Sequence, residues 1–539
     1  MSTKTRNLDV LIVGAGVAGL YALHSAREAG LRVRLFEGAP DLGGTWYWNR
    51  YPGCRCDIES VEYSYSFNDA LQQEWSWSER YAAQPEILRY LNWVAERLAL
   101  RPDMEFDTWV RAARWSEDDQ NWVVELHTNE VVTTRFLVTA TGCLSAPKAI
   151  DIPGTNTFVG DVYYTYRWPH EPVDFSGKRV AMIGAGSSAI QSVPLIAQQA
   201  DQLTVFMRTA NFSVPLNNQP TDPAAEAEYK KDYAAHRAAE RRTFGGFVNV
   251  DGVPQLPRSD SALAASTEER EAEFEYRWRA GGLTFYTSYA DLLTDDDANA
   301  LVSDFMRRKI RAKIHDPRKA DILTPRRFPA MTKRLCADTG YYETYNLDHV
   351  DVVDIRETPI ERITPAGVEV AGDVREFDAI VFATGFDAVT GALDNIVIEG
   401  RGGERLRDLW RDGPTTYLGL MTHGFPNLFN VAGPGSGASL THAIPCDEHQ
   451  VDTVMQCISR VLSEGAGSIE PTREAEDQWT ERVERVAYQT LFPKADSWYM
   501  GANVPGKARK PLLYLGGFRD YIERVDEVID NDFAGFAVS

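Results

Sequence analysis

The 539-residue sequence predicts an α/β protein with two Rossmann-like dinucleotide-binding domains and a helical insertion in the second of them. Two glycine-rich fingerprints support this prediction, and each follows a short apolar run typical of a buried parallel strand. A third observation is an Ala-Thr-Gly sequence that ends an apolar run after each fingerprint, at 140–142 and at 383–385. Each of these repeats marks the expected return of the chain to its own nucleotide-binding sheet.

The first fingerprint lies near the N-terminus, directly after an apolar run at 9–13. Its turn residues are Gly14, Gly16, Val17 and Gly19. Glycines allow a tight turn and let the backbone approach a pyrophosphate at the N-terminus of the following helix. A second strand at 32–36 ends at Glu37, whose carboxylate is placed to accept hydrogen bonds from ribose hydroxyls. Because its negative charge would repel a 2′-phosphate, this site suits FAD or NAD rather than NADPH.

The second fingerprint follows an apolar run at 180–183 and differs from the first in its charge. Its turn and helix start carry Gly184, Gly186, Ser187, Ser188 and, further along, Gln191. After the next strand, at 203–207, the chain has Arg208 and Thr209 where the first unit has an acid. A guanidinium there suits the 2′-phosphate of NADP, although a solvated surface arginine is the alternative. The charges therefore predict FAD at the first site and NADPH at the second.

Composition restricts the classes of function. A net charge of −22 argues against a nucleic-acid partner and against an anionic membrane. Six cysteines without a CxxC pair argue against a disulfide scaffold, a metal site and the flavin-dependent disulfide reductases. The apolar stretch at 10–20 follows Lys4 and Arg6 and could imitate a secretory signal, but Asp9 and three glycines weaken that interpretation. We expect a cytoplasmic protein with reduced thiols and no membrane span.

The expected domain order is discontinuous. Residues 1–145 and 388–539 are predicted to form the FAD-binding domain, and residues 146–215 and 327–387 the NADP-binding domain. Residues 216–326 are polar and rich in Ala, Glu and Arg, which predicts a helical insertion that splits the NADP-binding domain. Apolar patches of the insertion could line a substrate pocket, but structural packing is the preferred interpretation for each residue taken singly.

Local periodicity predicts several elements outside the fingerprints. Residues 84–100 have a helical pattern that opens near a proline, and 105–140 has the alternation of short β-strands. Within the insertion, 222–242 and 267–279 are predicted to be helical.

A rarer pattern lies between the two fingerprints. It consists of Phe158-x-Gly160, then Tyr164, then Trp168-Pro169. This spacing resembles the fingerprint of type I Baeyer–Villiger monooxygenases, a flavin- and NADPH-dependent family whose pattern is Phe-x-Gly-x-x-x-His-x-x-x-Trp-Pro. Tyr164 stands where the family has His, so the chain departs from the pattern at this point. For this stretch alone, an aromatic-rich interdomain linker is the alternative.

The resemblance extends over nearly the whole chain and is closest to the cyclohexanone and phenylacetone monooxygenase group. Residues 43–46 read Gly-Gly-Thr-Trp and lead to Asp57, eleven residues after the tryptophan, as in the second motif of the family. The resemblance implies that Asp57 lies near the reactive edge of the flavin. It also implies that FAD contacts Gly44, Thr45, Trp46, Tyr63 and Val110. An aromatic surface loop is the alternative for this segment.

The same resemblance assigns residues to the nicotinamide nucleotide. The segment 329–336 is similar to the one that carries the family's active-site arginine, so Arg334 is predicted to be catalytic and to contact NADP. Lys333 is predicted to contact the 2′-phosphate, and Arg55 is also assigned to the NADP site.

Two loops near the C-terminus complete the expected site. Residues 494–507 resemble the family's mobile loop, in which Trp498 would fold over the bound nucleotide, and their glycines suit a lid. A glycine-rich loop at 433–438 precedes His442. His442 could line the pocket, although a structural histidine is the alternative.

The resemblance implies a reaction between small molecules, a ketone and O2. NADPH reduces FAD, the reduced flavin forms a C4a-peroxyflavin with O2, and this species converts the ketone to an ester or lactone, with sulfoxidation as a side activity. Arg334 is expected to stabilise the developing negative charge, and Asp57 to orient Arg334. The protein is expected to be a monomer or a weak homo-oligomer.

Three other functions stay open from the sequence. The first is a flavin monooxygenase that oxidises nitrogen or sulfur, against which the Trp168-Pro169 ending argues. The second is an uncoupled NADPH oxidase that releases peroxide, which the Tyr164 departure keeps in consideration. The third is a nucleotide-binding redox sensor without catalysis, against which Arg334 and Asp57 argue.

Overall fold

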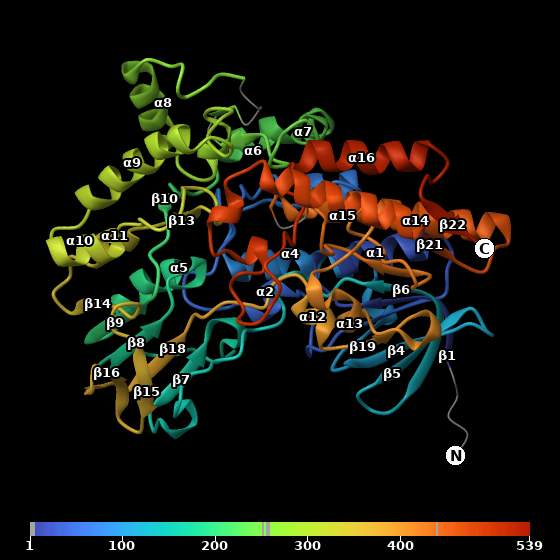
Figure 1. Ribbon diagram of the computed structural model, residues 1–539, viewed down its shortest axis with the longest axis horizontal. Helices are drawn as coiled ribbons and strands as arrows, with labels where there is room; N and C mark the ends of the chain where they lie inside the picture. The colour runs from blue at the N-terminus through green and yellow to red at the C-terminus, as the bar shows by residue number, and fades with distance from the viewer. Residues whose placement is uncertain (1–5, 251–252, 255–258, 438–439) are drawn as a thin grey trace.

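Two β-sheets built around parallel strands, each covered by helices, organise the molecule (Figure 1). The computed structural model describes residues 6–250, 253–254, 259–437 and 440–539. The larger sheet has the strand order β19-β4-β5-β6-β1-β2-β3, with β20 paired to β6. Its strands are β1 (Arg6–Val13), β2 (Val33–Phe36), β3 (Met104–Glu105), β4 (Val110–Ser116), β5 (Asn121–Leu126), β6 (Val131–Thr139), β19 (Val397–Glu399) and β20 (Leu428–Asn430). The sheets confirm the predicted α/β class.

The central strand β1 is apolar along most of its length because both of its faces are covered. Val10, Leu11 and Ile12 are at most 1% exposed. Strand β1 pairs in parallel with β2 and with β6, and Val13 lies level with Phe36. These three strands therefore end at one edge of the sheet, where the turn after β1 begins.

The smaller sheet repeats this arrangement with the order β14-β9-β8-β18-β7. Its strands are β7 (Asp161–Tyr164), β8 (Arg179–Ile183), β9 (Gln202–Met207), β14 (Val350–Asp354) and β18 (Ala379–Phe382). Strand β8 pairs in parallel with β9 and β18, and Ile183 lies level with both Phe206 and Phe382. Helix α5 (Ser187–Ala197) follows β8, so the second glycine turn also lies at the carboxyl edge of a parallel sheet.

The predicted helical insertion contains α6 (Pro223–Lys230), α7 (Tyr233–Glu240), α8 (Thr267–Ala280), α9 (Asp296–Ala312) and α10 (Pro317–Leu323). Strand β10 (Ser213–Pro215) pairs with β13 (Cys336–Asp338) where the chain enters and leaves it. Helix α10 packs against β14 of the smaller sheet, and α9 and α8 extend from it toward the top of the view, while α6 and α7 lie near α16 (Phe518–Asp530) (Figure 1). The prediction of one helical stretch over 222–242 was wrong in detail. Asp232 interrupts it, because its side chain accepts a hydrogen bond from Ala235 N at 3.1 Å and caps α7.

The C-terminal part returns to the larger sheet. Helix α1 (Val17–Glu28), which follows β1, packs against α14 (Ala443–Glu464), and α14 also packs against α16. Tyr21 Oη donates a hydrogen bond to Asp452 at 2.6 Å across the α1–α14 contact. The long helix α14 therefore covers the first fingerprint and brings residues near 440 toward it.

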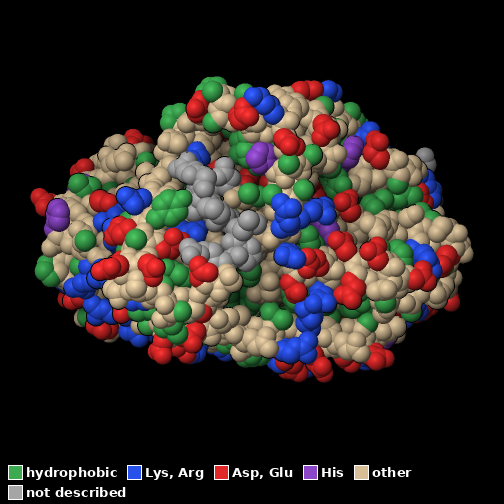
Figure 2. All heavy atoms as spheres, turned by 90° about the horizontal axis from the view of Figure 1, so that it is seen from above, with side chains coloured by type: hydrophobic (Ala, Val, Ile, Leu, Met, Phe, Trp, Pro, Cys, Tyr) green, Lys and Arg blue, Asp and Glu red, His purple; other side chains and the backbone are tan. Residues whose placement is uncertain are grey.

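The remaining elements lie around these two sheets and the insertion. They include α2 (Thr45–Trp48), α3 (Asp69–Glu74), α4 (Gln84–Arg97), α11 (Tyr341–Thr344), α12 (Gly391–Asp394), α13 (Leu406–Leu409), α15 (Arg473–Tyr488), β11 (Asn249–Val250), β12 (Val253–Pro254), β15 (Ile360–Thr364), β16 (Gly367–Val370), β17 (Asp373–Glu376), β21 (Ile469–Pro471) and β22 (Phe536–Val538). None of the helices in the described part of the chain has both the length and the apolar composition that a membrane span requires. Figure 2 shows acidic and basic side chains interspersed over one face, with hydrophobic side chains in small scattered groups.

Candidate functional site

The turn after β1 is built so closely that it requires glycine at two positions. Gly14 has a φ of +107°, and a Cβ placed on it would lie 2.5 Å from Ala140 O. A Cβ on Gly19 would lie 1.8 Å from Gly14 O. The turn is therefore held between α1 and the end of β6, and the helix starts directly behind it, from Val17. Free backbone N–H groups at such a helix start suit a pyrophosphate.

Glu37 lies at the end of β2 and is only 7% exposed. Its carboxylate accepts hydrogen bonds from Ala15 N at 2.7 Å and from Ala39 N at 2.8 Å. Burial raises its pKa. Because an ionised carboxylate accepts about four hydrogen bonds, these two contacts orient the group and leave capacity for ribose hydroxyls. The turn and the acid together fit the adenosine diphosphate half of FAD.

The aromatic loop after β2 lies against this turn. Gly44 has a φ of +53°, and a Cβ on it would lie 2.8 Å from the Cα of Gly16. Trp46, in α2, donates from Nε1 to Tyr63 Oη at 3.1 Å. The ring of Tyr63 stacks on His442, with centroids 5.5 Å apart. The structure thus brings the residues predicted at the flavin ring to one side of the first fingerprint.

Arg334 and Asp57 form a bidentate ion pair although they are 277 residues apart in sequence. Arg334 Nε and Nη2 donate to the two carboxylate oxygens, both at 2.9 Å, and Nη1 donates to Leu440 O at 3.0 Å. The side chains of Arg334 and Asp57 are 19% and 27% exposed. Burial alone would lower the pKa of Arg334, but the charge of Asp57 raises it, so the guanidinium stays charged.

Two tyrosines that the sequence did not mark as site residues lie within electrostatic range of this pair. Leu335 N donates to Tyr286 Oη at 3.2 Å, and burial raises the pKa of Tyr286 to about 12. Burial also raises the pKa of Tyr499, and both Tyr286 and Arg334 act on it. Both phenols are therefore neutral near pH 7, so they add polar but uncharged groups to the neighbourhood of the ion pair.

The second fingerprint turn also requires glycine. Gly184 has a φ of +135°, and a Cβ on it would lie 2.2 Å from Ala383 O. Gly186 faces open space, with no atom within 4 Å of a Cβ placed there. This open position at the start of α5 leaves room for a pyrophosphate to approach the backbone.

Residues near the start of α5 also contact the first domain. Gln191 donates from Nε2 to Arg55 O at 3.1 Å and accepts from Tyr51 Oη at 2.9 Å. Arg55 itself donates to Glu79 at 2.8 Å. Ser187 Oγ lies 3.2 Å from the thiol of Cys336, and Ser188 follows it on α5. Arg55 and Gln191 therefore lie where the two nucleotide-binding units meet.

Cations gather after β9, where the sequence predicts the 2′-phosphate site. Arg356 donates to Arg208 O at 3.1 Å and to Thr209 Oγ1 at 2.7 Å, which places its guanidinium beside both residues. Burial lowers the pKa of Lys333 to about 8. The negative charge of Asp496 opposes this shift. The positive charges of three neighbours lower the pKa further: Arg208, Arg356 and Lys148. Several cations thus lie within electrostatic range of one another at this end of the sheet, an arrangement that suits a strongly charged anion. Lys148 and Arg356 are additions that no local sequence pattern indicates.

The fingerprint between the nucleotide turns forms the outer strand of the smaller sheet, β7, and continues to Trp168 and Pro169. Phe158 packs against the core of the smaller sheet. Gly160 lies so close to the neighbouring strand that a Cβ on it would be 2.4 Å from Asp378 O. Tyr164 stacks on Phe382, with ring centroids 5.5 Å apart. Trp168 is 6% exposed and stacks on Tyr163.

The segment that ends in Pro169 lines a surface cavity of about 590 Å³ between the two units. Arg50 and Pro52 of the first unit form the opposite wall, together with residues of α4. Tyr164, at the end of β7, is part of the second unit, whereas Trp168-Pro169 lies at the boundary between the units.

The remaining predicted residues are placed as follows. Val110 begins β4 and packs in the core beside Phe36. Trp498 begins a short 3-10 helix, and its ring lies 4.3 Å from that of Tyr499. The predicted loop 433–438 is described only to Gly437, and Ala438 lies outside the described residues.

His442 is fully buried, and Gly246 O lies 3.3 Å from its Nδ1. Burial lowers its pKa to about 3, so the imidazole is neutral near pH 7. The described residues contain no group of His, Cys, Asp and Glu that could hold a metal ion, and all six cysteines are free.

Comparisons with known proteins extend over the full chain. Residues 11–231 match a family model described as pyridine nucleotide-disulphide oxidoreductase. A protein of Pseudooceanicola batsensis described as a Baeyer–Villiger monooxygenase is 40% identical and is matched over 99% of this chain and 97% of its own. A protein of Lysobacter antibioticus described as a phenazine N-monooxygenase is also 40% identical, over 98% of this chain and 97% of its own.

Solved structures agree with these relatives. An oxidized steroid monooxygenase bound to NADP has a TM-score of 0.93 and 48% identity, and the match covers 99% of both chains. A complex of OTEMO with FAD and NADP has a TM-score of 0.94 and 40% identity, over 99% of this chain and 100% of that one. Identity at this level over at least 99% of each chain indicates a shared family as well as a shared fold.

Proposed function

This chain belongs to the Baeyer–Villiger monooxygenases, and from that premise we propose that Arg334 and Asp57 form its oxygenation site. The enzyme uses FAD, NADPH and O2 to convert ketones to esters or lactones. The observation that supports the site assignment most is the bidentate Arg334–Asp57 pair, held also by Leu440 O, beside the aromatic loop of the first fingerprint.

Bound FAD supplies the redox chemistry, because it accepts hydride from NADPH and activates O2. Arg334 presents a permanently charged guanidinium at the place where negative charge develops, and a rigid fork of donors suits an oxyanion. Asp57 and Leu440 O hold the guanidinium in one orientation before the reaction starts, so no reorganisation is needed when charge appears. Asp57 also offsets the positive charge of Arg334, which would otherwise disfavour the positive charge that a nicotinamide ring bound nearby would gain on giving up hydride.

We propose that FAD binds at Gly14, Gly16, Val17, Gly19, Glu37, Gly44, Thr45, Trp46, Asp57, Tyr63 and Val110. We propose that NADP binds at Arg55, Gly184, Gly186, Ser187, Ser188, Gln191, Arg208, Thr209, Lys333, Arg334 and Trp498. The buried acid at the first turn and the cations at the second support this order. Glu37 would repel a 2′-phosphate, whereas Arg208 and Lys333 would attract it. The cation cluster also gives a pH dependence that can be measured.

Raising the pH through the pKa of Lys333 is expected to weaken NADPH binding. Burial lowers this pKa to about 8 in the free protein, so the ammonium group is charged below that pH and loses its charge above it. The KM for NADPH should therefore rise above about pH 8, by at most about tenfold per pH unit, while the KM for NADH changes less. Lys333→Arg should flatten the profile, because arginine keeps its charge. Equal pH dependence for NADPH and NADH would contradict the assignment of Lys333.

The family function is tested by incubating the purified FAD-loaded protein with NADPH, O2 and a panel of cyclic, aryl and steroid ketones. Ester or lactone detected by mass spectrometry, in proportion to NADPH consumed, is the expected result. NADPH consumption without ester for any ketone would contradict it. Buffer with NADPH and free FAD but no protein is the control for spontaneous oxidation.

A second candidate, oxygenation of nitrogen, is favoured by one observation, the 40% identity with a phenazine N-monooxygenase. Adding an N-heterocycle and a ketone together distinguishes the two, because the faster product shows which reaction the site prefers. An uncoupled NADPH oxidase would instead release peroxide with both.

We also propose, from composition, a cytoplasmic protein that is a monomer or a weak homo-oligomer. Light scattering after gel filtration measures the oligomeric state directly.

A further inference from the structure

A short segment of the insertion contacts three parts of the molecule that are distant in sequence. We call residues 237–248 the strap; it runs from the last turn of α7 to Val248. Two of its backbone carbonyls accept hydrogen bonds. Gly245 O accepts from His442 N at 2.7 Å, and Phe244 O accepts from Phe518 N at 2.8 Å. Val248 N donates to the carboxylate of Glu62 at 2.8 Å. The strap therefore joins the loop after Asp57 with the starts of α14 and α16.

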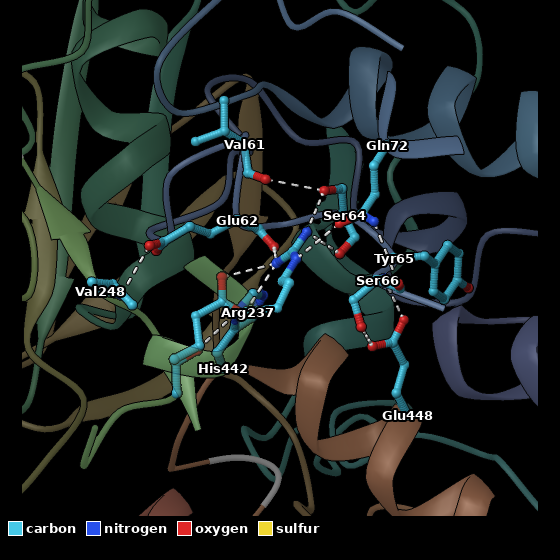
Figure 3. A network of polar contacts seen from close by, with 12 residues as sticks. Val61, Glu62, Ser64, Tyr65, Ser66, Gln72, Arg237, Val248, His442 and Glu448 are labelled. Carbon is cyan, nitrogen blue, oxygen red and sulfur yellow. Dashed lines mark hydrogen bonds and ion pairs between the residues drawn. The ribbon is translucent and has the colours of Figure 1, made fainter. Parts of the chain in front are cut away.

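Arg237 makes several hydrogen bonds from the strap to the loop that follows Asp57 (Figure 3). Its Nη1 donates to Glu62 O at 2.9 Å, and its Nη2 donates to Ser64 O at 3.0 Å and to Ser64 Oγ at 2.9 Å. Its Nε donates to Gln72 at 3.2 Å. Nη1 also donates to Glu240 at 2.9 Å, within α7. Every nitrogen of the guanidinium is thus used, and two backbone carbonyls of the loop depend on it.

The pair of Arg237 and Glu240 is almost completely buried, with side chains 11% and 1% exposed. Burial alone would lower the pKa of Arg237, but Glu240 raises it, so Arg237 stays charged. A buried charged group with several hydrogen bonds fixes its partners in one geometry, because any shift leaves a polar group unpaired.

The two carbonyls held by Arg237 lie on either side of Tyr63. Tyr63 Oη accepts the hydrogen bond of Trp46, and its ring stacks on His442. The same loop starts at Asp57, which holds Arg334. The other contact of Arg334 is Leu440 O, which lies two residues before His442. Both groups that hold Arg334 are therefore on segments that the strap contacts.

We propose that Arg237 is a positioning residue of the oxygenation site: it fixes the loop from Asp57 to Ser64 and, through Tyr63 and His442, the segment of Leu440. This inference rests on the function proposed for Arg334. It gives the helical insertion a part in orienting Arg334, in addition to any part in lining a substrate pocket. Arg237 touches neither Arg334 nor Asp57, so it acts only through these segments.

Arg237→Lys is the first test, because lysine keeps the charge but lacks the rigid fork that reaches both carbonyls. We expect FAD to stay bound, ester formation per bound FAD to fall about 10- to 100-fold, and the peroxide released per NADPH to rise. A loss of this size corresponds to one or two misplaced hydrogen bonds to a charged group. The KM for the ketone should change less than kcat, because the loss is in orientation rather than in binding area.

A second variant separates positioning from stability. Arg237→Met with Glu240→Leu removes both buried charges, so the thermal stability should return toward that of the wild type. The loop carbonyls still lack their donor, so the peroxide release should persist. The visible circular dichroism of bound FAD should also differ from the wild type in both variants, because Tyr63 and Trp46 shift. This signal needs no turnover.

Two matched controls complete the experiment. Arg242→Met changes an exposed arginine of the strap, and Glu476→Gln perturbs a buried carboxylate of α15 that accepts from His423 N at 2.9 Å. Neither should change peroxide release or the flavin signal. Arg237→Lys with wild-type ester yield and an unchanged flavin signal would overturn the positioning role, even if its melting temperature fell. A wild-type enzyme that forms no ester would overturn the proposed function instead, and the flavin signal would still decide the role of Arg237.

Discussion

An Arg334→Ala variant is expected to bind FAD normally and to form ester about 10²- to 10³-fold more slowly than the wild type. Arg334 lies beside the flavin-side loop but none of its three hydrogen bonds goes to the nucleotide turn, so FAD binding should survive. What the variant lacks is a charged donor that Asp57 and Leu440 hold in one orientation. Steady-state product formation at saturating NADPH and ketone measures the loss.

Arg327→Ala is the matched control, because Arg327 is an exposed arginine in the segment that leads to Arg334. It removes the same net charge and should leave ester formation within about twofold of the wild type. Arg334→Lys should lie between the two, since it keeps the charge but not the bidentate contact. Ester formation by Arg334→Ala at the wild-type rate would refute the catalytic assignment.

A Gly19→Ala variant is expected to lose FAD. The added Cβ would lie 1.8 Å from Gly14 O, and Gly14 cannot move away because its own Cα faces Ala140 O. Forcing a methyl group into such a contact costs about 1–3 kcal/mol, and here the strain falls on the turn that must receive the pyrophosphate. FAD binding should weaken about 10- to 100-fold. The ratio of flavin absorbance to protein absorbance after gel filtration measures it.

Gly186→Ala provides the contrast at the equivalent turn of the second unit. Its Cβ would meet no atom within 4 Å in the protein, so the fold and the FAD content should be unchanged. The methyl group would nevertheless stand where the pyrophosphate of NADPH approaches, so the KM for NADPH should rise. Normal FAD content in Gly19→Ala, or lost FAD in Gly186→Ala, would show that the two turns do not hold the cofactors as proposed.

The fold class could be predicted from sequence because its signals are local. Each fingerprint occupies a strand, a turn and a helix within about 30 residues, so glycine spacing and apolar runs suffice. The sequence also predicts the order of the cofactors, because Glu37 and Arg208 stand at equivalent strand ends and carry opposite charges; this order stays a prediction. The structure adds that Glu37 is already oriented by two backbone N–H groups, which sequence spacing does not show.

Much of the site could not be predicted, because it is assembled from distant segments. Arg356 joins the cation cluster 148 positions after Arg208, and Leu440 reaches Arg334 from 106 positions away. Neither residue belongs to a motif. Asp57 and Arg334 were predicted together only through resemblance to a family, since nothing in either local sequence indicates a partner 277 residues away.

The role of Arg237 was missed for a related reason. In sequence it is one of several cations on a polar helical stretch, which is typical of a solvated surface. Only tertiary packing shows that this part of α7 is buried against the loop after Asp57. Tyr164 shows the opposite case: the departure from the family pattern was visible in sequence, but its stacking on Phe382 was not.

The central claim is that oxygen is transferred from O2 to a ketone, and isotope labelling tests it most directly. The FAD-loaded enzyme is supplied with NADPH, a cyclic ketone and ¹⁸O2, and the product is analysed by mass spectrometry while NADPH and peroxide are measured. The account predicts a lactone that carries one ¹⁸O atom for each NADPH consumed, with little peroxide. Stoichiometric labelled peroxide with the ketone recovered unchanged would contradict it and would establish an oxidase instead.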